Sequence, residues 1–259
     1  MLAAFSLSGE AVVLAGGLDP AYRVGDVVLK RADSAEEVAW KSELLGRIVE
    51  SGFRVARPVR ALDGSWTAEG WMASRYVEGR LEPKDWAQLF GAAGAFHAAL
   101  SAEPRPSFLD HLDHRWARAH RAAWEQAEVE SLEAVRPRLE RLRALAGPVH
   151  GTPQLIHGDL AGNVLFAKAM VPAILDFSPW WAPVSYAEGI LAADALLWYG
   201  AGIEILGLVA EPSDFPGVLA RGALFRLLAV NEGAKEGHSE YLEELPRYDD
   251  LITLIEARS

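Results

Sequence analysis

The stretch QLIHGDLAGNVLFAKAMVPAILDF, residues 154–177, carries most of the information about fold and function in this sequence. Its apolar runs are typical of buried strands, and they flank a polar loop over residues 157–163. The pattern predicts a strand, the loop, a short strand, a turn and a last strand. Because the apolar runs fix both ends of the loop, we expect the side chains of Asp159, Asn163 and Asp176 to be brought together at strand ends.

These three side chains suit phosphate chemistry. Magnesium prefers oxygen ligands, keeps several waters and needs few protein ligands when substrate phosphates complete its coordination. Asn163 and Asp176 can supply such ligands, which leaves Asp159 to accept or orient an acceptor hydroxyl. The alternative for HGD taken alone is a turn with Asx hydrogen bonds. The combined spacing of loop and strands favours the phosphoryl-transfer site.

A metal hydrolase is a weaker alternative. The chain has no cysteine, so a thiolate nucleophile, a disulfide and a cysteine-based metal site are excluded. The remaining candidate ligands are histidines, and their spacing forms no zinc pattern. They are His97, His111, His114, His120 and His150. Scattered surface or core histidines explain them better.

The amino-terminal third has the pattern of short strands and one helix. Apolar runs within residues 10–31 predict two strands joined by a turn-rich segment. Ser34 stands at an N-cap position, with Glu37 three residues later as in a capping box. Gly52 is expected to end the helix that follows. Turn and strand signals up to residue 77 then predict more strands of an antiparallel sheet.

The rest of the chain is mainly helical in pattern. Long amphipathic runs occupy residues 83–102 and 113–146, the second interrupted by Pro137. A small β-rich part followed by a larger helical part predicts an α+β fold and not an alternating βαβ fold. We therefore predict a boundary that separates residues 1–77 from residues 78–259.

Charge and hydropathy limit the partners. The formal net charge is −11, which should repel nucleic acid, and no local basic patch is evident. The acidity can serve solubility or attract a cationic substrate, and charge alone does not separate the two. No stretch approaches the roughly 20 apolar residues of a membrane helix, and the amino terminus lacks the basic region of a secretory signal. Neither a membrane nor a nucleic-acid partner is expected, and the cytoplasm is the default location. The sequence does not reveal the oligomeric state.

HGDLAGN followed by ILDF resembles the catalytic-loop and metal-aspartate motifs of the aminoglycoside phosphotransferases and related kinase-like families. The resemblance extends over nearly the whole chain, and LAGGLDPAYRVGDVVLK with HGDLAGNVLF is similar to an actinobacterial subgroup. It implies a two-lobed protein-kinase-like fold with a small antiparallel-sheet lobe and a larger helical lobe. It also implies that Asp159 is the catalytic base, that Asn163 and Asp176 hold Mg²⁺, and that His157 and Gly158 shape the loop.

The same resemblance implies a nucleotide site in the amino-terminal lobe. Lys30, at the end of an apolar run, would contact the α- and β-phosphates, or it is an ordinary exposed strand-end lysine. Glu43 fits the helix glutamate that orients this lysine. Glu36 and Glu37 are nearer in sequence and stay possible partners.

Two further segments belong to the implied nucleotide site. Gly16 and Gly17 replace a three-glycine loop and allow close backbone approach to phosphates, unless the segment is a plain hairpin turn. The segment WMASRYVEG resembles the hinge between the lobes, where backbone groups hold adenine. Ser74 and Tyr76 are the backbone candidates, and an ordinary strand end is the alternative.

The resemblance implies transfer of the γ-phosphoryl group of ATP or GTP, with magnesium, to a hydroxyl of a small molecule such as an aminoglycoside or amino sugar. The chain lacks the Ala-Pro-Glu element that protein kinases carry after the metal aspartate, which favours a small acceptor. The rival is a nucleotide-binding pseudokinase that acts as a scaffold or sensor. The poor glycine loop and the short Asp159–Asn163 spacing, one residue less than in the family, support that rival.

The acceptor side offers two weaker signals. Trp180 and Trp181 follow the metal aspartate, and their aromatic faces can stack on a sugar or a cation, or pack in the core. The acidic segment EYLEELPRYDD, residues 240–250, can line a cleft for a cation or form a solvated helix face. Together with the net charge, these signals favour a cationic, ring-bearing acceptor.

Overall fold

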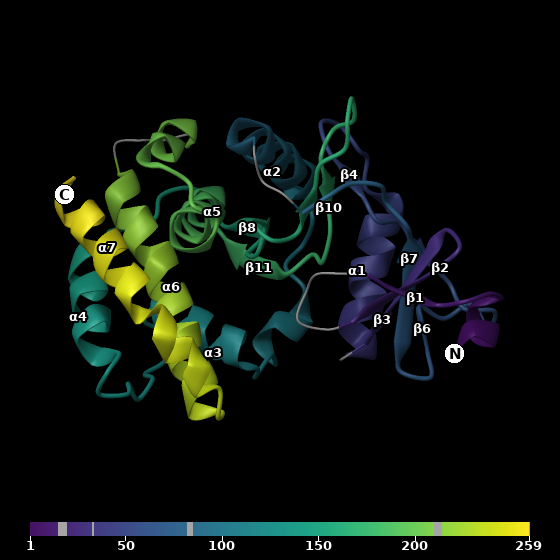
Figure 1. Cartoon of the computed structure of the whole chain (residues 1–259), viewed down its shortest axis with the longest axis horizontal. Coiled ribbons are helices and arrows are strands. Elements are labelled where there is room, and N and C mark those ends of the chain that lie inside the picture. Colours follow the sequence, from purple (N-terminus) through teal and green to yellow (C-terminus); the bar gives the residue numbers. More distant parts are fainter. Residues whose placement is uncertain (15–19, 33, 82–84, 210–213, 259) are drawn as a thin grey trace. The chain divides into compact units, whose positions relative to one another are not determined.

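The protein forms two compact units. The computed structural model describes residues 1–14, 20–32, 34–81, 85–209 and 214–258. The first unit combines Met1–Ala99 with Gly162–Phe177, and the second combines Leu100–Ala161 with Ser178–Ser259. Both units are therefore built from two separate stretches of chain (Figure 1).

A six-stranded antiparallel sheet is built from the amino-terminal residues of the first unit. Its strand order is β1-β2-β3-β7-β5, and β6 pairs with β7. The strands are β1 (Val12–Leu14), β2 (Ala21–Val24), β3 (Val27–Arg31), β5 (Pro58–Val59), β6 (Thr67–Ala68) and β7 (Trp71–Arg75). The short 3₁₀ helix η1 (Leu2–Phe5) packs its Phe5 into the core on one face of the sheet. The predicted antiparallel sheet of the amino-terminal part is confirmed.

Helix α1 (Ala35–Arg47) begins as its capping pattern predicts. The Ser34 side chain accepts a hydrogen bond from the Glu37 backbone N–H at 3.3 Å. The helix ends well before Gly52, because Ile48 already has extended backbone angles. The Arg57 guanidinium stabilises this early end by donating to the carbonyls of Leu45 and Ile48 at 2.6 and 3.0 Å, which have no partner further along the helix.

A second, three-stranded sheet brings a late stretch of chain into the first unit. Strand β10 (Ala173–Ile174) pairs in parallel with β4 (Arg54–Val55) and antiparallel with β9 (Val164–Leu165). A bridge between Arg80 and Phe166 adds two backbone hydrogen bonds of 3.0 Å. The β9–β10 hairpin thus belongs with the amino-terminal residues and not with the helical part.

Helix α2 (Trp86–Leu100) also packs within the first unit. Phe96 is fully buried and contacts the rings of Phe53 and Phe177 edge to face, with centroids 5.2 and 5.3 Å apart. The predicted boundary at residue 77 therefore differs from the observed division, in which α2 up to Ala99 and residues 162–177 join the first unit. Aromatic packing and the β4–β10 pairing cause this difference.

The second unit is mainly helical and contains one antiparallel pair of strands. Its α-helices are α3 (Arg115–Ala123), α4 (Arg136–Leu145), α5 (Val184–Trp198), α6 (Phe215–Lys235) and α7 (Leu245–Glu256). The short 3₁₀ helices are η2 (Ser107–Asp110), η3 (Ile203–Leu208) and η4 (Ser239–Glu244). Strands β8 (Gln154–His157) and β11 (Pro179–Ala182) form an antiparallel pair. The expected helical run over 113–146 is two helices, and Pro137 lies in the first turn of α4, where its missing N–H costs nothing.

Helix α6 is the centre of the second unit, with α3, α4, α5 and α7 packed against it. Figure 1 shows α5 and α7 beside it. The α5–α6 contact requires glycine, because a Cβ on Gly222 would lie 2.5 Å from the backbone of Gly189. Within the described residues, no helix is both long and apolar enough to cross a membrane. The predicted α+β class, with a sheet in the amino-terminal part and helices in the carboxy-terminal part, is confirmed.

Candidate active site

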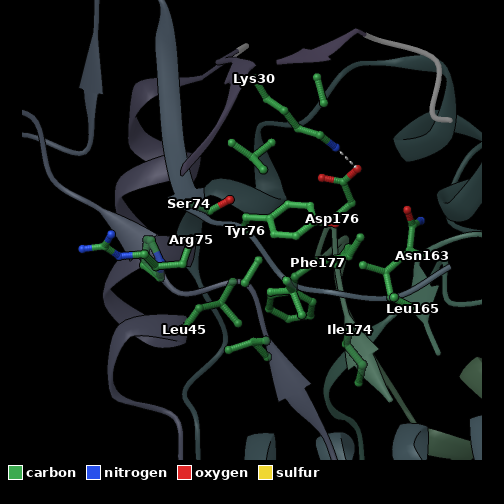
Figure 2. Close-up of a pocket in the computed structure, with 18 of the residues that line it drawn as sticks. Lys30, Leu45, Ser74, Arg75, Tyr76, Asn163, Leu165, Ile174, Asp176 and Phe177 are labelled. Carbon is green, nitrogen blue, oxygen red and sulfur yellow. Dashed lines mark hydrogen bonds and ion pairs between the residues drawn. The ribbon is translucent and has the colours of Figure 1, made fainter. Parts of the chain in front are cut away.

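A pocket of about 520 Å³ lies in the first unit. Residues of β3, α1, β7 and the β9–β10 hairpin line it, and they include Lys30, Ser74, Asn163 and Asp176 (Figure 2). Its lining also contains many apolar side chains, such as Leu45. A mainly apolar pocket with a few convergent polar groups is the usual form of a small-molecule site.

The β9–β10 hairpin places Asn163 and Asp176 at the same end of the pocket. Asn163 precedes β9 and Asp176 follows β10, so the antiparallel pairing brings the two positions together. The Leu175 N–H donates to the Asn163 carbonyl at 2.8 Å and extends the hairpin by one step. Asp176 has φ of 41°, a left-handed conformation that costs energy in a residue with a side chain. Such strain is common at functional sites.

Lys30 reaches the pocket because of the strand period. Val27 and Leu29 are buried in the core on one face of β3, so Val28 and Lys30 face the pocket on the other. The Lys30 ammonium donates to the Asp176 carboxylate, as Figure 2 shows. Both side chains stay partly exposed, at 30% and 47%, so the pair contributes little to stability. It does hold two opposite charges at the pocket.

The expected pair between Lys30 and Glu43 is not formed in the structure. The Glu43 carboxylate accepts hydrogen bonds from Trp66 and Arg60 at 2.9 and 2.6 Å, and these bonds lower its pKa. Helix α1 turns other residues toward the pocket, namely Lys41, Ser42 and Leu45.

The nearer alternative, Glu37, is also engaged elsewhere. It forms an ion pair with Lys41 at 2.8 Å, one turn further along α1. The helical phase of α1 explains the result for Glu43, because the face that carries Lys41 and Leu45 meets the pocket while Glu43 lies on another face. Glu37 shares the face of Lys41, and its carboxylate is held by that lysine.

The predicted hinge residues line the pocket, but one of their backbone groups is already used. The Tyr76 N–H donates to the Asp26 carbonyl at 2.7 Å, and the Arg23 guanidinium lies 3.6 Å from the centre of its ring. Ser74 sits inside β7 between Val28 and Pro58. Gly16 and Gly17, the expected phosphate loop, lie outside the described residues.

Asp159 lies in the second unit, two residues after the end of β8. Its backbone N–H donates to Nδ1 of the buried His157 at 3.1 Å. The Gly158 N–H donates to the Ser178 carbonyl at 3.0 Å, and a Cβ on Gly158 would lie 2.0 Å from the Trp180 ring. His157 and Gly158 therefore shape the backbone that presents the Asp159 carboxylate.

A buried charge network supports Asp159, and the sequence analysis missed it. Arg226 on α6 donates from Nη2 to Oδ1 of Asp159 at 2.7 Å. The same guanidinium binds both oxygens of Asp194 on α5, at 2.6 Å from Nε and 2.5 Å from Nη2. Burial raises the pKa of Asp194 to about 6, against the opposing effect of Arg226. Burial alone would lower the pKa of Arg226, but the two aspartates raise it above its usual value. The sequence does carry a signal for this pair, since Arg226 and Asp194 each interrupt an apolar run, LFRLL and AADAL. Two opposite charges in apolar runs indicate a buried ion pair.

Trp180 is a core residue and does not offer a face to an acceptor. It is 7% exposed and stacks on His120, with ring centroids 4.5 Å apart and an angle of 13°. Phe225 and His114 contact its other edges. The packing alternative is therefore correct for Trp180, whereas Trp181 is half-buried.

Two residues of the acidic segment 240–250, Glu244 and Tyr248, contact Trp198, whose ring lies near the Arg226 guanidinium. Glu244 accepts a hydrogen bond from Nε1 of Trp198 at 2.9 Å. The Trp198 ring lies 5.9 Å from the Arg226 guanidinium. Glu243 is exposed. Among the described residues, no three His, Asp or Glu side chains come together as metal ligands.

The sequence matches one protein family, which fits the geometry above. A profile of the phosphotransferase enzyme family matches residues 10–180, about two thirds of the chain. The sheet, the pocket and the hairpin fall inside that range and define a phosphotransferase of kinase-like fold. The chain belongs to the phosphotransferase enzyme family. Among curated proteins, none matches the sequence significantly.

Solved structures with a similar fold include three small-molecule kinases. A thermostable mutant of aminoglycoside phosphotransferase APH(4)-Ia, in a ternary complex with AMP-PNP and hygromycin B, is 14% identical with a TM-score of 0.62, covering 95% of this chain and 93% of that one. Spectinomycin phosphotransferase APH(9)-Ia, in complex with ADP and spectinomycin, is also 14% identical with a TM-score of 0.60, covering 95% and 92%. A choline/ethanolamine kinase family protein from Mesorhizobium loti is 16% identical with a TM-score of 0.61, covering 97% and 88%. At these identities the likeness shows the fold.

The half-buried His120, which stacks on Trp180 and has a buried Nδ1, predicts an acid-sensitive stability. Burial, and to a lesser degree Arg121, lowers the pKa of His120 to about 3, while an unfolded histidine titrates near 6.5. Below pH 6.5 the unfolded state binds the proton and the folded state does not, so stability falls as the pH falls toward 3. Between pH 7 and 5, urea unfolding should show that the parent loses about 2 kcal/mol more than His120→Phe. Equal losses in the two proteins would contradict this assignment.

Proposed function

We propose that this chain transfers the γ-phosphoryl group of ATP or GTP, with magnesium, to a hydroxyl group of a small molecule. The observation that carries the proposal is the pocket at which Lys30 and Asp176 are paired and Asn163 is adjacent in the lining. A magnesium nucleotide brings anionic phosphates for Lys30 and a cation for Asp176. It can therefore replace the Lys30–Asp176 pair without leaving either charge unbalanced.

Asn163 and Asp176 would hold the magnesium ion. Their amide and carboxylate oxygens are the hard donors that this ion prefers, and the hairpin brings both positions to one end of the pocket. When bound, magnesium neutralises charge that develops on the transferring phosphoryl group. Lys30 would contact the α- and β-phosphates from the neighbouring strand.

The adenine or guanine base would lie between the apolar walls of the pocket, where Leu45, Phe96 and Ile174 line it. Ser74 and Tyr76 remain the proposed hinge contacts. For Tyr76 the carbonyl is the proposed contact, because its N–H already donates to Asp26. Val77, the next residue, also lines the pocket and can supply an N–H.

Asp159 would act as the base toward the acceptor hydroxyl. Its carboxylate is 46% exposed, while its backbone is fixed by bonds at His157 and Gly158. Such an aspartate orients the hydroxyl and takes its proton as the phosphoryl group is transferred. Positioning and charge neutralisation supply most of the catalysis in this reaction class.

A cationic acceptor is favoured by the charge of the chain and by its structural relatives. The net charge is −11, and Glu244 with Trp198 extends from the acidic segment toward the Arg226 network. The related structures bind hygromycin B and spectinomycin, which are amine-bearing compounds with hydroxyl groups. We therefore propose an amino sugar, an aminoglycoside or a similar amine as the acceptor class.

Replacing Asp159 tests the base. Asp159→Asn should lower turnover by at least about 1,000-fold, because the amide cannot take a proton. Nucleotide affinity, measured by calorimetry, should stay within a few-fold. Near-normal turnover in the variant would show that Asp159 is not the base. Nucleotide binding by the parent without any ATP consumption on an amine panel would favour a binding protein instead of an enzyme.

Replacing Asp176 tests the metal site. In the parent, magnesium should tighten ATP binding, because Asp176 would hold the ion and the ion would neutralise charge on the phosphates. Asp176→Ala should remove most of this tightening, which calorimetry with and without magnesium measures. Glu43→Ala is the matched control, since Glu43 binds Arg60 and Trp66 and lies outside the pocket lining. The same magnesium dependence in Asp176→Ala and the parent would refute the assignment.

Salt and charge reversal test the acceptor. Electrostatic attraction is screened with a Debye length of about 8 Å near physiological ionic strength, so the KM of a cationic acceptor should rise with salt. Joint replacement Glu243→Lys and Glu244→Lys should raise that KM about tenfold, or about 1.4 kcal/mol. Glu140→Lys, an exposed change on α4, should have less than a twofold effect. A neutral best acceptor with salt-independent KM would show that the acidity serves solubility.

A further inference from the structure

Helix α6 carries a charge in a place where burial is costly. The Arg226 side chain is 4% exposed, and Asp194, its partner on α5, is 3% exposed. An isolated buried charge would cost several kcal/mol, so each side chain depends on the other. The two-point contact of the guanidinium with the Asp194 carboxylate fixes the orientation of Arg226.

This orientation directs one N–H of Arg226 at the proposed base. Nη2 donates to Oδ1 of Asp159 at 2.7 Å, and the Gly158 carbonyl lies 3.5 Å from the same nitrogen. The Asp159 carboxylate is thus held from the buried side while nearly half of its surface is exposed.

The charges around Asp159 come from several elements. Arg226 faces it from α6 and Asp194 from α5, while His157 contacts its backbone from β8. Tyr199, after α5, also senses both aspartates, because burial and then the two carboxylates raise its pKa. Since Asp194 already balances Arg226, the cluster of three charges keeps one net negative charge. The contact can therefore fix Asp159 without cancelling the charge that a base needs.

We propose that Arg226, itself oriented by Asp194, is the positioning residue that holds the Asp159 carboxylate toward the acceptor. This inference rests on the proposed role of Asp159 as the base. Because its side chain is only 4% exposed, Arg226 would act through Asp159 and not by touching the acceptor or the transferred phosphoryl group. Its effect is to restrict the rotation of the carboxylate, and a misplacement of about 1 Å at such a group can cost about 100-fold in rate.

The test uses the full chain and two complementary variants. Arg226→Met combined with Asp194→Leu replaces the buried pair by apolar side chains of similar size, a change that often preserves folding. Turnover of Mg-ATP with hygromycin B as the acceptor probe should fall about 10- to 100-fold, with the KM for ATP within about threefold. Asp194→Asn keeps the arginine charge and removes only its partner. This second variant keeps the test valid if the double variant does not fold.

The two variants should shift the titration of Asp159 in opposite directions. Loss of the adjacent guanidinium destabilises the charged carboxylate, so the pKa of Asp159 and the acidic limb of the rate profile should move to higher pH in the double variant. In Asp194→Asn the charge of Arg226 is balanced by Asp159 alone. The pKa of Asp159 and the acidic limb of the rate profile should therefore move to lower pH. Carbon-13 NMR of the Asp159 carboxyl group measures this pKa without any turnover.

Arg221→Met is the matched control. Arg221 is a buried arginine of the same helix, but within the described residues its guanidinium donates to the backbone carbonyls of Ala123 and Gly147 and to no carboxylate. Its loss should lower stability and leave the Asp159 pKa and the KM for ATP unchanged. A folded double variant with kcat within threefold of the parent and an unshifted Asp159 pKa would overturn the inference. A different result is a parent that shows no turnover while the Asp159 pKa still shifts in the two variants. That result would refute the proposed function and leave the Arg226–Asp159 contact supported.

Discussion

The parallel pairing of β10 with β4 is the interaction on which the first unit depends. It carries residues 162–177 away from the stretch that precedes them in sequence and joins them to the amino-terminal residues. This pairing, together with the Arg80–Phe166 bridge, brings Asn163 and Asp176 to the pocket of Lys30. Two residue pairs between β10 and β4 therefore complete the pocket of the first unit. The contacts of Phe96 with Phe53 and Phe177 support this pairing.

Local signals predicted the elements well, and long-range contacts decided the rest. Ser34 and the Val27–Leu29 alternation report backbone preferences of neighbouring residues, so the helix start and the strands were predictable. The partner of Lys30 was not predictable from spacing, because the phase of α1 turns Glu43 toward Arg60. Trp180 was ambiguous for the same reason, since only the fold brings His120 against its face. The end of α1 depended on Arg57, which lies ten residues beyond the helix.

The Arg226–Asp194 pair of the second unit and the Lys30–Asp176 pair of the first unit differ in exposure. Lys30 and Asp176 are partly exposed and can exchange partners at little cost, whereas Arg226 and Asp194 are buried and cannot separate without a large penalty. A binding group must release its partner when a ligand arrives, and a supporting group must not. This difference in exposure is consistent with the two proposed roles, nucleotide binding for Lys30 and Asp176 and support of Asp159 for Arg226 and Asp194.

The discontinuous first unit has a consequence for synthesis on the ribosome. Strand β4, with Arg54, must wait for Ala173 before its partner exists, and a stretch of the second unit is made in between. The six-stranded sheet can form early, because all its strands lie in the first third of the chain. The three-stranded sheet stays incomplete until the β9–β10 hairpin has left the ribosome. During that interval the apolar side of Phe53 and Phe96 lacks Phe177 and is exposed to other chains. A holding chaperone that covers this surface would therefore raise the yield of folded protein most when translation pauses before residue 177.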